Sequence, residues 1–141
     1  MKKKPPRRFA GAAERNQTMQ TVSTNAAPAA IGPYSQAKVS GNFVFTSGQL
    51  PVDPATGAFA GASIEAQAEQ SCKNVITILE AAGSSAEKVL KTTCFLANIG
   101  DFAAFNAVYA KFFTSAPARS CFAVKDLPKG ALCEIEAVAE L

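Results

Sequence analysis

The 141-residue chain contains no histidine, and this absence restricts the chemistry that its side chains can perform. Neither a Ser-His-Asp nor a Cys-His nucleophile can form, and no metal site can use histidine ligands. Four cysteines, far apart and without a C-x-x-C pair, predict reduced thiols and no metal site. They are Cys72, Cys94, Cys121 and Cys133. Catalysis would therefore depend on Arg, Glu, Asp, Lys, Tyr, Cys, backbone groups and water.

Arg119 and Glu134 lie in the last two segments with strand character. The final segment alternates between apolar residues and glutamates, with Cys133, Ile135, Ala137 and Ala139 between Glu134, Glu136 and Glu140. Because side chains alternate along a strand, the glutamates share one face. If Phe122 and Val124 lie on the apolar face, Arg119 and Cys121 lie on the other face, together with Glu134. The sequence thus predicts an arginine and a carboxylate on one face of a sheet.

Other strands and two helices must position these residues. Apolar residues three and four positions apart predict a helix over residues 64–79, which Gly83 would end. A second helix would begin at Asp101 and carry one aromatic stripe of Phe102, Phe105, Tyr109 and Phe112. Strands are predicted at residues 21–23, 38–39, 43–46, 89–96, 119–124 and 132–140. The order β-β-β-α-β-α-β-β predicts a single α+β domain.

Two helices can cover only one face of such a sheet, so the second face must contact either water or another subunit. In the first case, Arg119 and Glu134 would form an ordinary surface pair, which contributes little to stability. In the second case, symmetric association would enclose both side chains in a cleft between subunits. Periodicity alone does not choose between these alternatives.

Residues 1–18 differ in composition from the rest of the chain. They contain six basic residues and one acidic residue, which leaves a net charge of −2 on residues 19–141. This composition predicts a disordered basic extension followed by one domain. Three origins are open for the extension: an organelle-targeting peptide, a natural tail, or an over-extended gene start upstream of the true initiator Met19.

The composition also predicts the compartment and excludes some partners. A mildly acidic domain argues against nucleic acid as a partner. No apolar stretch approaches the roughly 20 residues that span a bilayer, so no membrane partner is expected. The reduced cysteines predict a cytoplasmic protein, or an organellar one if residues 1–18 are a targeting peptide.

Short motifs occur in order along the predicted domain. They are Ala27-Pro28-Ala29-Ala30-Ile31-Gly32-Pro33-Tyr34-Ser35-Gln36-Ala37, Thr46-Ser47-Gly48-Gln49-Leu50-Pro51, Pro117-Ala118-Arg119-Ser120-Cys121, Leu127-Pro128-Lys129-Gly130 and Glu134-Ile135-Glu136-Ala137. Together with Asn74, Asn106 and Tyr109, they make the chain from Met19 onward resemble the Rid family of reactive intermediate deaminases, also called the YjgF family.

The resemblance implies a chorismate-mutase-like α+β fold of the bacillus type, with a mixed sheet and two helices on one face. It also implies a homotrimer whose sheets line a central barrel, with active sites at the subunit interfaces. The implied substrates are the enamine 2-aminoacrylate and the imines 2-iminopropanoate and 2-iminobutanoate, which are hydrolysed to 2-keto acids and ammonia. Such a reaction needs no cofactor.

The resemblance and the residue chemistry together assign four catalytic candidates, namely Arg119, Glu134, Tyr34 and Cys121. Arg119 would bind the substrate carboxylate, since a planar guanidinium makes a two-pronged, charge-assisted bond. Glu134 would hold the attacking water and accept its proton if burial raises its pKa; the alternative is a salt bridge to a neighbour. Tyr34 would donate to the imine nitrogen, or else it packs at a subunit interface.

Ser47, Gly48 and Cys121 are, beside Arg119, the candidates for substrate contacts. Backbone groups of Ser47 and Gly48 could bond the carboxylate, because glycine permits close approach, although Ser-Gly is also a common turn. Cys121 is two residues from Arg119, and we expect its backbone rather than its thiol to act. A nucleophilic thiol would need activation that no histidine can supply here.

Two other functions remain open for this sequence. A single-strand endoribonuclease that inhibits translation would use the basic extension and the arginine on phosphates, but the acidic domain argues against it. A non-catalytic trimer would bind small carboxylic acids through Arg119 without turnover. Catalytic turnover therefore distinguishes the non-catalytic trimer from the deaminase.

Overall fold

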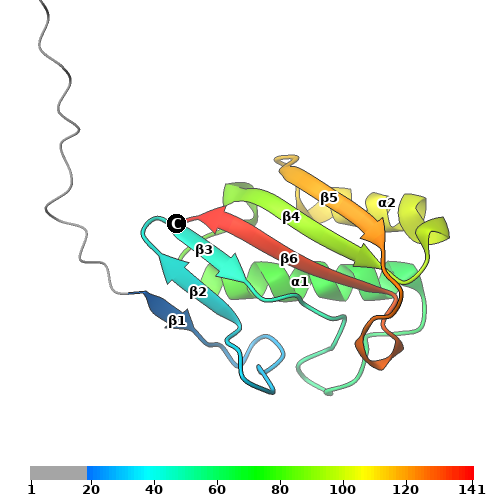
Figure 1. Ribbon diagram of the computed structural model, residues 1–141, viewed down its shortest axis with the longest axis horizontal. Helices are drawn as coiled ribbons and strands as arrows, with labels where there is room; N and C mark the ends of the chain where they lie inside the picture. The colour runs from blue at the N-terminus through cyan, green and yellow to red at the C-terminus, as the bar shows by residue number, and fades with distance from the viewer. Residues whose placement is uncertain (1–18) are drawn as a thin grey trace, which may run out of the picture.

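The computed structural model describes residues 19–141, which form a six-stranded sheet with two α-helices behind it (Figure 1). The strands are β1 (Gln20–Val22), β2 (Ala37–Ser40), β3 (Phe43–Thr46), β4 (Val89–Leu96), β5 (Ala118–Ala123) and β6 (Cys133–Glu140). The α-helices are α1 (Ile64–Ala81) and α2 (Phe102–Phe112), and short 3-10 turns cover Ala86–Lys88, Ile99–Asp101 and Pro128–Gly130. The predicted basic extension at residues 1–18 lies outside the described residues.

The sheet has the strand order β1-β2-β3-β6-β4-β5. Neighbouring strands are antiparallel except for β4 and β5, which run parallel. A parallel pair needs a crossover connection, and α2 supplies it behind the sheet (Figure 1). The mixed sheet with both helices on one face confirms the predicted chorismate-mutase-like α+β fold class.

Helix α1 forms where the apolar spacing predicts it and packs across the middle of the sheet. The hydroxyl of Ser63 accepts a hydrogen bond from the backbone N–H of Ala66 at 3.2 Å and caps the first turn. After the last turn, Gly83 adopts a φ of +88°, a left-handed conformation that glycine adopts without strain. Neither α-helix in residues 19–141 is long and apolar enough to cross a membrane.

Strand β6 lies at the centre of the sheet and alternates as predicted. Its buried residues, which pack under the helices, are Cys133, Ile135, Ala137 and Ala139. The side chains of Glu134 and Glu136 are half-buried on the face that the helices leave uncovered, here called the open face. The alternation therefore places Glu134 on the open face.

Strand β5 contradicts the predicted arrangement of the arginine. Arg119 lies opposite Thr92 of β4, whose side chain is fully buried on the helix-covered face. Glu134 lies opposite Phe95 of β4, whose side chain points to the open face. Because opposite residues share a face, the prediction that Arg119 and Glu134 lie on one face is wrong.

The error has a physical cause in the position of β5 at the edge of the sheet. Most of its residues are exposed, so apolar character there does not mark the core face. Phe122 remains 45% exposed and packs edge-to-face on Phe95 of the open face, with ring centroids 5.5 Å apart. Cys121, opposite the buried Cys94, shares the helix-covered face with Arg119.

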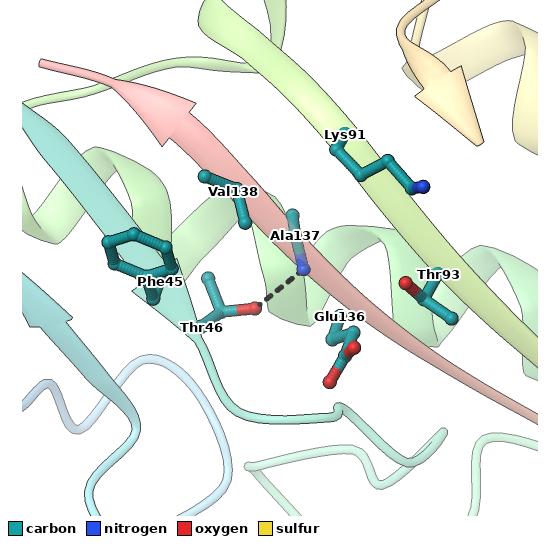
Figure 2. Close-up of a pocket in the computed structure, with 7 residues that line it drawn as sticks. All are labelled: Phe45, Thr46, Lys91, Thr93, Glu136, Ala137 and Val138. Carbon is teal, nitrogen blue, oxygen red and sulfur yellow. Dashed lines mark hydrogen bonds between the residues drawn. The ribbon is translucent and has the colours of Figure 1, made fainter. Parts of the chain in front are cut away.

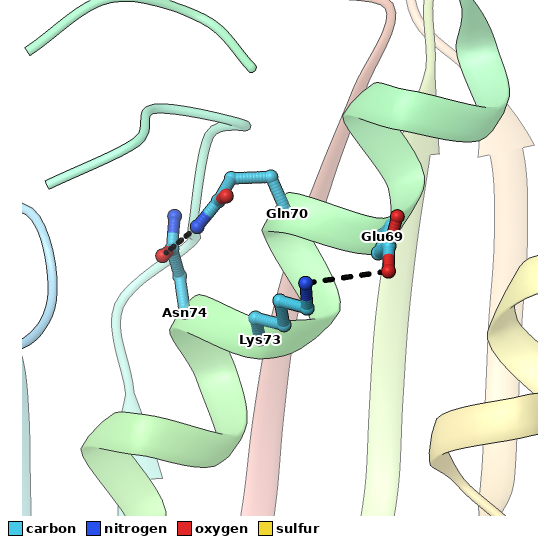
Figure 3. Close-up of polar contacts among 4 residues, drawn as sticks. All are labelled: Glu69, Gln70, Lys73 and Asn74. Carbon is cyan, nitrogen blue, oxygen red and sulfur yellow. Dashed lines mark hydrogen bonds and ion pairs between the residues drawn. The ribbon is translucent and has the colours of Figure 1, made fainter. Parts of the chain in front are cut away.

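A long connection between β3 and α1 is held in place by Asn74 of α1, whose hydrogen bond with Gln70 is drawn in Figure 3. The amide of Asn74 donates to the backbone carbonyls of Leu50 and Val52 at 3.0 and 2.9 Å, and it accepts a bond from Gln70 at 2.8 Å. The nearby ion pair between Lys73 and Glu69 is exposed and contributes little to stability. Asn74 thus fixes the segment that follows Ser47 and Gly48.

Candidate active site

Arg119 is held at the edge of the sheet by side chains of α2. Its Nη1 donates to Oδ1 of Asn106 at 2.7 Å. Its Cζ atom lies 4.8 Å from the ring centre of Tyr109 and 5.5 Å from that of Phe102. Aromatic rings at these distances attract a guanidinium without neutralising it. We call these four residues the arginine cluster; it presents a half-buried cation.

Helix α2 builds the arginine cluster with one of its faces. Phe102, Asn106 and Tyr109 are spaced by four and three residues, so they lie on the same face of a helix. Phe105 is fully buried in the core instead, while Phe102 stays 36% exposed beside Arg119. The predicted single aromatic stripe is therefore divided between the core and the arginine cluster.

Strand β4 holds the ring of Tyr109 in place. Its hydroxyl forms a 2.6 Å hydrogen bond with the hydroxyl of the fully buried Thr92. Burial raises the pKa of Tyr109, although Thr92 and Arg119 act in the opposite direction. The tyrosine is therefore neutral at physiological pH, and its ring gives the guanidinium a fixed surface.

Glu134 lies against Gly48, and with Ser47 these residues form what we call the carboxylate cluster. A Cβ atom at position 48 would collide with the carboxylate of Glu134, so this approach requires glycine. The hydroxyl of Ser47 donates to the carbonyl of Ser35 at 2.6 Å, and its backbone N–H donates to the carbonyl of Gln36 at 2.8 Å. The space beside Gly48 is therefore occupied by the side chain of Glu134, and the contact of Ser47 and Gly48 with a substrate carboxylate stays a prediction.

The environment of Glu134 suits a proton acceptor. Burial raises the pKa of its carboxyl, and the neighbouring charge of Glu136 raises it further. A raised pKa makes a carboxylate a better base towards water near neutral pH. Among residues 19–141, the only ion pair joins Lys73 and Glu69, so no described cation neutralises Glu134.

Tyr34 is 54% exposed in the segment that borders the carboxylate cluster. Its hydroxyl accepts a hydrogen bond from the backbone N–H of Ile31 at 3.3 Å. The next residue, Ser35, is bonded to Ser47. Tyr34 is therefore tied to the same loop edge as the carboxylate cluster, with its ring accessible.

Cys121 accompanies Arg119 rather than Glu134. Burial raises the pKa of its thiol, and the charge of Arg119 lowers it to a smaller extent. Burial also raises the pKa of Cys94 to about 12 and that of Cys133 to about 11. These thiols are protonated at neutral pH and are poor nucleophiles. No group of three metal-ligating side chains gathers anywhere in residues 19–141.

The candidate residues therefore fall into two groups that one copy of the chain keeps apart. Arg119 and Cys121 lie on the helix-covered face at the edge strand β5. Glu134 lies on the open face of β6, with β4 between the two strands. A ligand held by Arg119 of one copy is therefore on the wrong side of the sheet for Glu134 of that copy.

The open face also carries a pocket of about 260 Å³ (Figure 2). Its lining residues come from β3, β4 and β6 and are Phe45, Thr46, Lys91, Thr93, Glu136, Ala137 and Val138. None of the predicted site residues lines it. The hydroxyl of Thr46 accepts a hydrogen bond from the backbone N–H of Ala137 at 3.0 Å at its floor.

The role of α2 at the site could not be read from residue chemistry alone. Asn106 belongs to the motifs that resemble the Rid family, but it carries no charge and its partner is thirteen residues away. The available signal was a polar residue on the same helical face as Phe102 and Tyr109. Only the crossover packing of α2 on β4 and β5 makes that face meet Arg119.

Comparisons with known proteins agree on one family. A family model described as endoribonuclease L-PSP matches residues 24–141. The RutC family protein y4sK of Sinorhizobium fredii is 55% identical over 124 residues, which cover 87% of this chain and 98% of that protein. The 2-iminobutanoate/2-iminopropanoate deaminase of Salmonella typhimurium is 52% identical over 124 residues, which cover 85% of this chain and 96% of that protein.

A solved structure gives the same result. The crystal structure of the YjgF gene product from E. coli superposes with a TM-score of 0.83 at 49% sequence identity and covers 86% of this chain and 98% of that one. The matches in sequence and in fold agree, and the chain belongs to the Rid family, also called the YjgF family.

Proposed function

We propose that this protein hydrolyses 2-aminoacrylate, 2-iminopropanoate and 2-iminobutanoate to 2-keto acids and ammonia. The observation that supports the proposal most strongly is that Arg119 has a neutral hydrogen-bond partner and no carboxylate partner in the described part of the chain. Its hydrogen-bond partner is the neutral amide of Asn106, and among residues 19–141 no carboxylate pairs with it. Its charge is therefore available for a substrate carboxylate, which a guanidinium binds with two parallel hydrogen bonds.

The chemistry follows from the two clusters. The enamine 2-aminoacrylate first takes a proton from solvent at its CH2 carbon and loses one from nitrogen, which gives the imine 2-iminopropanoate. With the imine carboxylate on Arg119, Glu134 accepts a proton from a water whose oxygen attacks the C=N carbon, giving a carbinolamine. In this proposal the imine nitrogen takes a proton from the hydroxyl of Tyr34. On collapse of the carbinolamine, Glu134 returns its proton to the nitrogen, the C–N bond breaks as the C=O bond forms, and ammonia leaves. The hydroxyl proton of the carbinolamine passes through solvent to Tyr34, so both side chains regain their starting protonation states. Water is the nucleophile, so the reaction requires neither a cofactor nor a covalent intermediate.

A second copy of the chain completes this site in our proposal, within a homotrimer. The separation of Arg119 and Glu134 on opposite faces supports this, because one copy alone cannot bring them to one ligand. The open face also exposes the aromatic rings of Phe43, Phe45 and Phe122 at 40%, 48% and 45%. Packing this face around a symmetry axis would bury apolar surface and bring the edge strand of one copy to the carboxylate cluster of another.

A trapping assay tests the activity. A pyridoxal-phosphate-dependent dehydratase generates 2-aminoacrylate from serine, and semicarbazide competes for it as the trap. We expect the wild-type protein to divert the intermediate from the trap to pyruvate. Arg119→Ala should reduce this diversion by about 100-fold, because loss of a two-pronged charged bond costs roughly 3 kcal/mol. Lys73→Ala on α1, which removes an exposed cation paired only with Glu69, serves as the control. Unchanged trapping in the presence of wild-type protein would refute the deaminase.

One alternative has a specific observation in its favour, namely the description of the matching family model as an endoribonuclease. Residues 19–141 carry a net charge of −2, however, which disfavours contacts with phosphates. We therefore expect no cleavage of single-stranded RNA by the protein under conditions where the deaminase assay is positive. Cleavage that disappears in Arg119→Ala would establish the alternative.

A further inference from the structure

We propose that Asn106 is a positioning residue for Arg119 and that it reserves the edge formed by Nε and Nη2 for the substrate carboxylate. The inference rests on the proposed function, because it concerns how the substrate is oriented. It starts from the hydrogen bond of 2.7 Å from Nη1 of Arg119 to Oδ1 of Asn106. Nε and Nη2 share the opposite edge of the guanidinium, which can still form two parallel hydrogen bonds.

Two aromatic rings restrict the remaining motion of the guanidinium. The rings of Tyr109 and Phe102 lie 4.8 and 5.5 Å from its Cζ atom. Tyr109 is itself fixed, because its hydroxyl is bonded to the buried hydroxyl of Thr92 at 2.6 Å. The rings limit tilting of the guanidinium, and the bond to Asn106 limits its rotation within its own plane. The orientation of the free edge is therefore set before a substrate arrives.

The neutral charge of Asn106 is part of its role. An aspartate at this position could accept the same hydrogen bond, but its charge would cancel that of Arg119 and weaken the attraction for a substrate carboxylate. An alanine would leave the charge intact but release the guanidinium. Asparagine provides the acceptor oxygen without the charge, so orientation and charge can be separated experimentally.

Asn106→Ala and Asn106→Asp should therefore impair different kinetic constants. For Asn106→Ala we expect kcat to fall about 10-fold with a smaller change in KM, because orientation is lost while charge is kept. For Asn106→Asp we expect KM to rise about 10-fold with a smaller change in kcat. Asn106→Leu, which preserves more of the side-chain volume, should behave like Asn106→Ala. Thermal unfolding of each variant checks that the fold is intact.

A double-mutant cycle separates a positioning role from a structural one. A lysine at position 119 keeps the charge but has no planar fork to orient. In the Arg119→Lys background, we expect Asn106→Ala to change kcat by less than about 2-fold, since its effect passes through the guanidinium. Equal losses in both backgrounds, or no loss in either, would overturn the inference while leaving the deaminase activity of the wild type in place.

Binding provides a second readout that does not require turnover. We expect calorimetric titration with 2-oxobutanoate to show about 10-fold weaker binding to Asn106→Asp than to wild type. If the wild type binds 2-oxobutanoate but does not turn over imines, and Asn106→Asp binds more weakly, the role of a neutral residue 106 in carboxylate binding stands and the proposed reaction fails. If Asn106→Asp binds as tightly as wild type, Asn106 does not control the charge at this site and the inference is refuted.

Discussion

A neutral amide and two aromatic rings hold the guanidinium of Arg119, so the strongest cation of the site keeps its charge. This arrangement suits recognition of a small acid better than a structural ion pair does. A salt bridge would hold the arginine equally well but would compete with the ligand. We therefore expect ligand binding at this site to depend as much on the neutral partners of Arg119 as on the arginine itself.

The pH dependence of activity should follow the carboxyl of Glu134. Because burial and the charge of Glu136 raise its pKa, its base form is lost as pH falls through that raised pKa. Glu136→Gln removes a negative neighbour, so the acid limb of kcat/KM should move to lower pH. Glu140→Gln, on the same strand, should leave the limb in place. An acid limb that Glu136→Gln does not move would exclude Glu134 as the group that titrates.

Cys121 should contribute through its backbone only. Burial raises the pKa of its thiol, and a protonated thiol is a poor nucleophile. We expect Cys121→Ser to retain kcat/KM within about 3-fold, because it keeps the backbone and nearly the same volume. A loss comparable with that of Arg119→Ala in the trapping assay would instead establish a role for the sulfur.

At the scale of elements, the sequence was informative where a segment packs on one side only. Strand β6 lies at the centre of the sheet with one covered face, so its alternation correctly placed Glu134 on the open face. Strand β5 lies at an edge, where both faces are partly exposed. Taking the apolar Phe122 as a core residue therefore placed Arg119 on the wrong face of the sheet. Helix α2 has both a core face and a site face, which periodicity alone merged into one stripe.

Gly48, in the connection after β3, allows a prediction about a single substitution. A methyl group there would collide with the carboxylate of Glu134, whose flexible end can move away. We expect Gly48→Ala to reduce kcat/KM by at least about 10-fold with less than about 1 kcal/mol lost from the free energy of unfolding.

Gly100→Ala is the matched control for this prediction. A Cβ atom at Gly100 has nothing within 4 Å, and its φ lies outside the left-handed region. Wild-type activity in Gly48→Ala would show that the approach of Gly48 to Glu134 does not matter for catalysis.

For the whole molecule, the decisive feature is the separation of the two clusters by the sheet. The motifs name the residues of both clusters, but a list of residues does not say which face each one occupies. That depends on the parallel register of β5 on β4, which places Arg119 beside Thr92. Register at an edge strand is weakly specified by side-chain pattern, so it could not be obtained from the sequence.

Mixing two inactive variants tests the central claim most directly. Arg119→Ala lacks the proposed carboxylate anchor and Glu134→Gln lacks the proposed base, so each should be nearly inactive alone in the trapping assay. If a site takes Arg119 from one copy and Glu134 from another, equal co-assembly restores about a quarter of the sites by random pairing. We therefore predict about a quarter of wild-type pyruvate formation from the co-assembled variants. A mixture no more active than its separate components would contradict a site shared between copies.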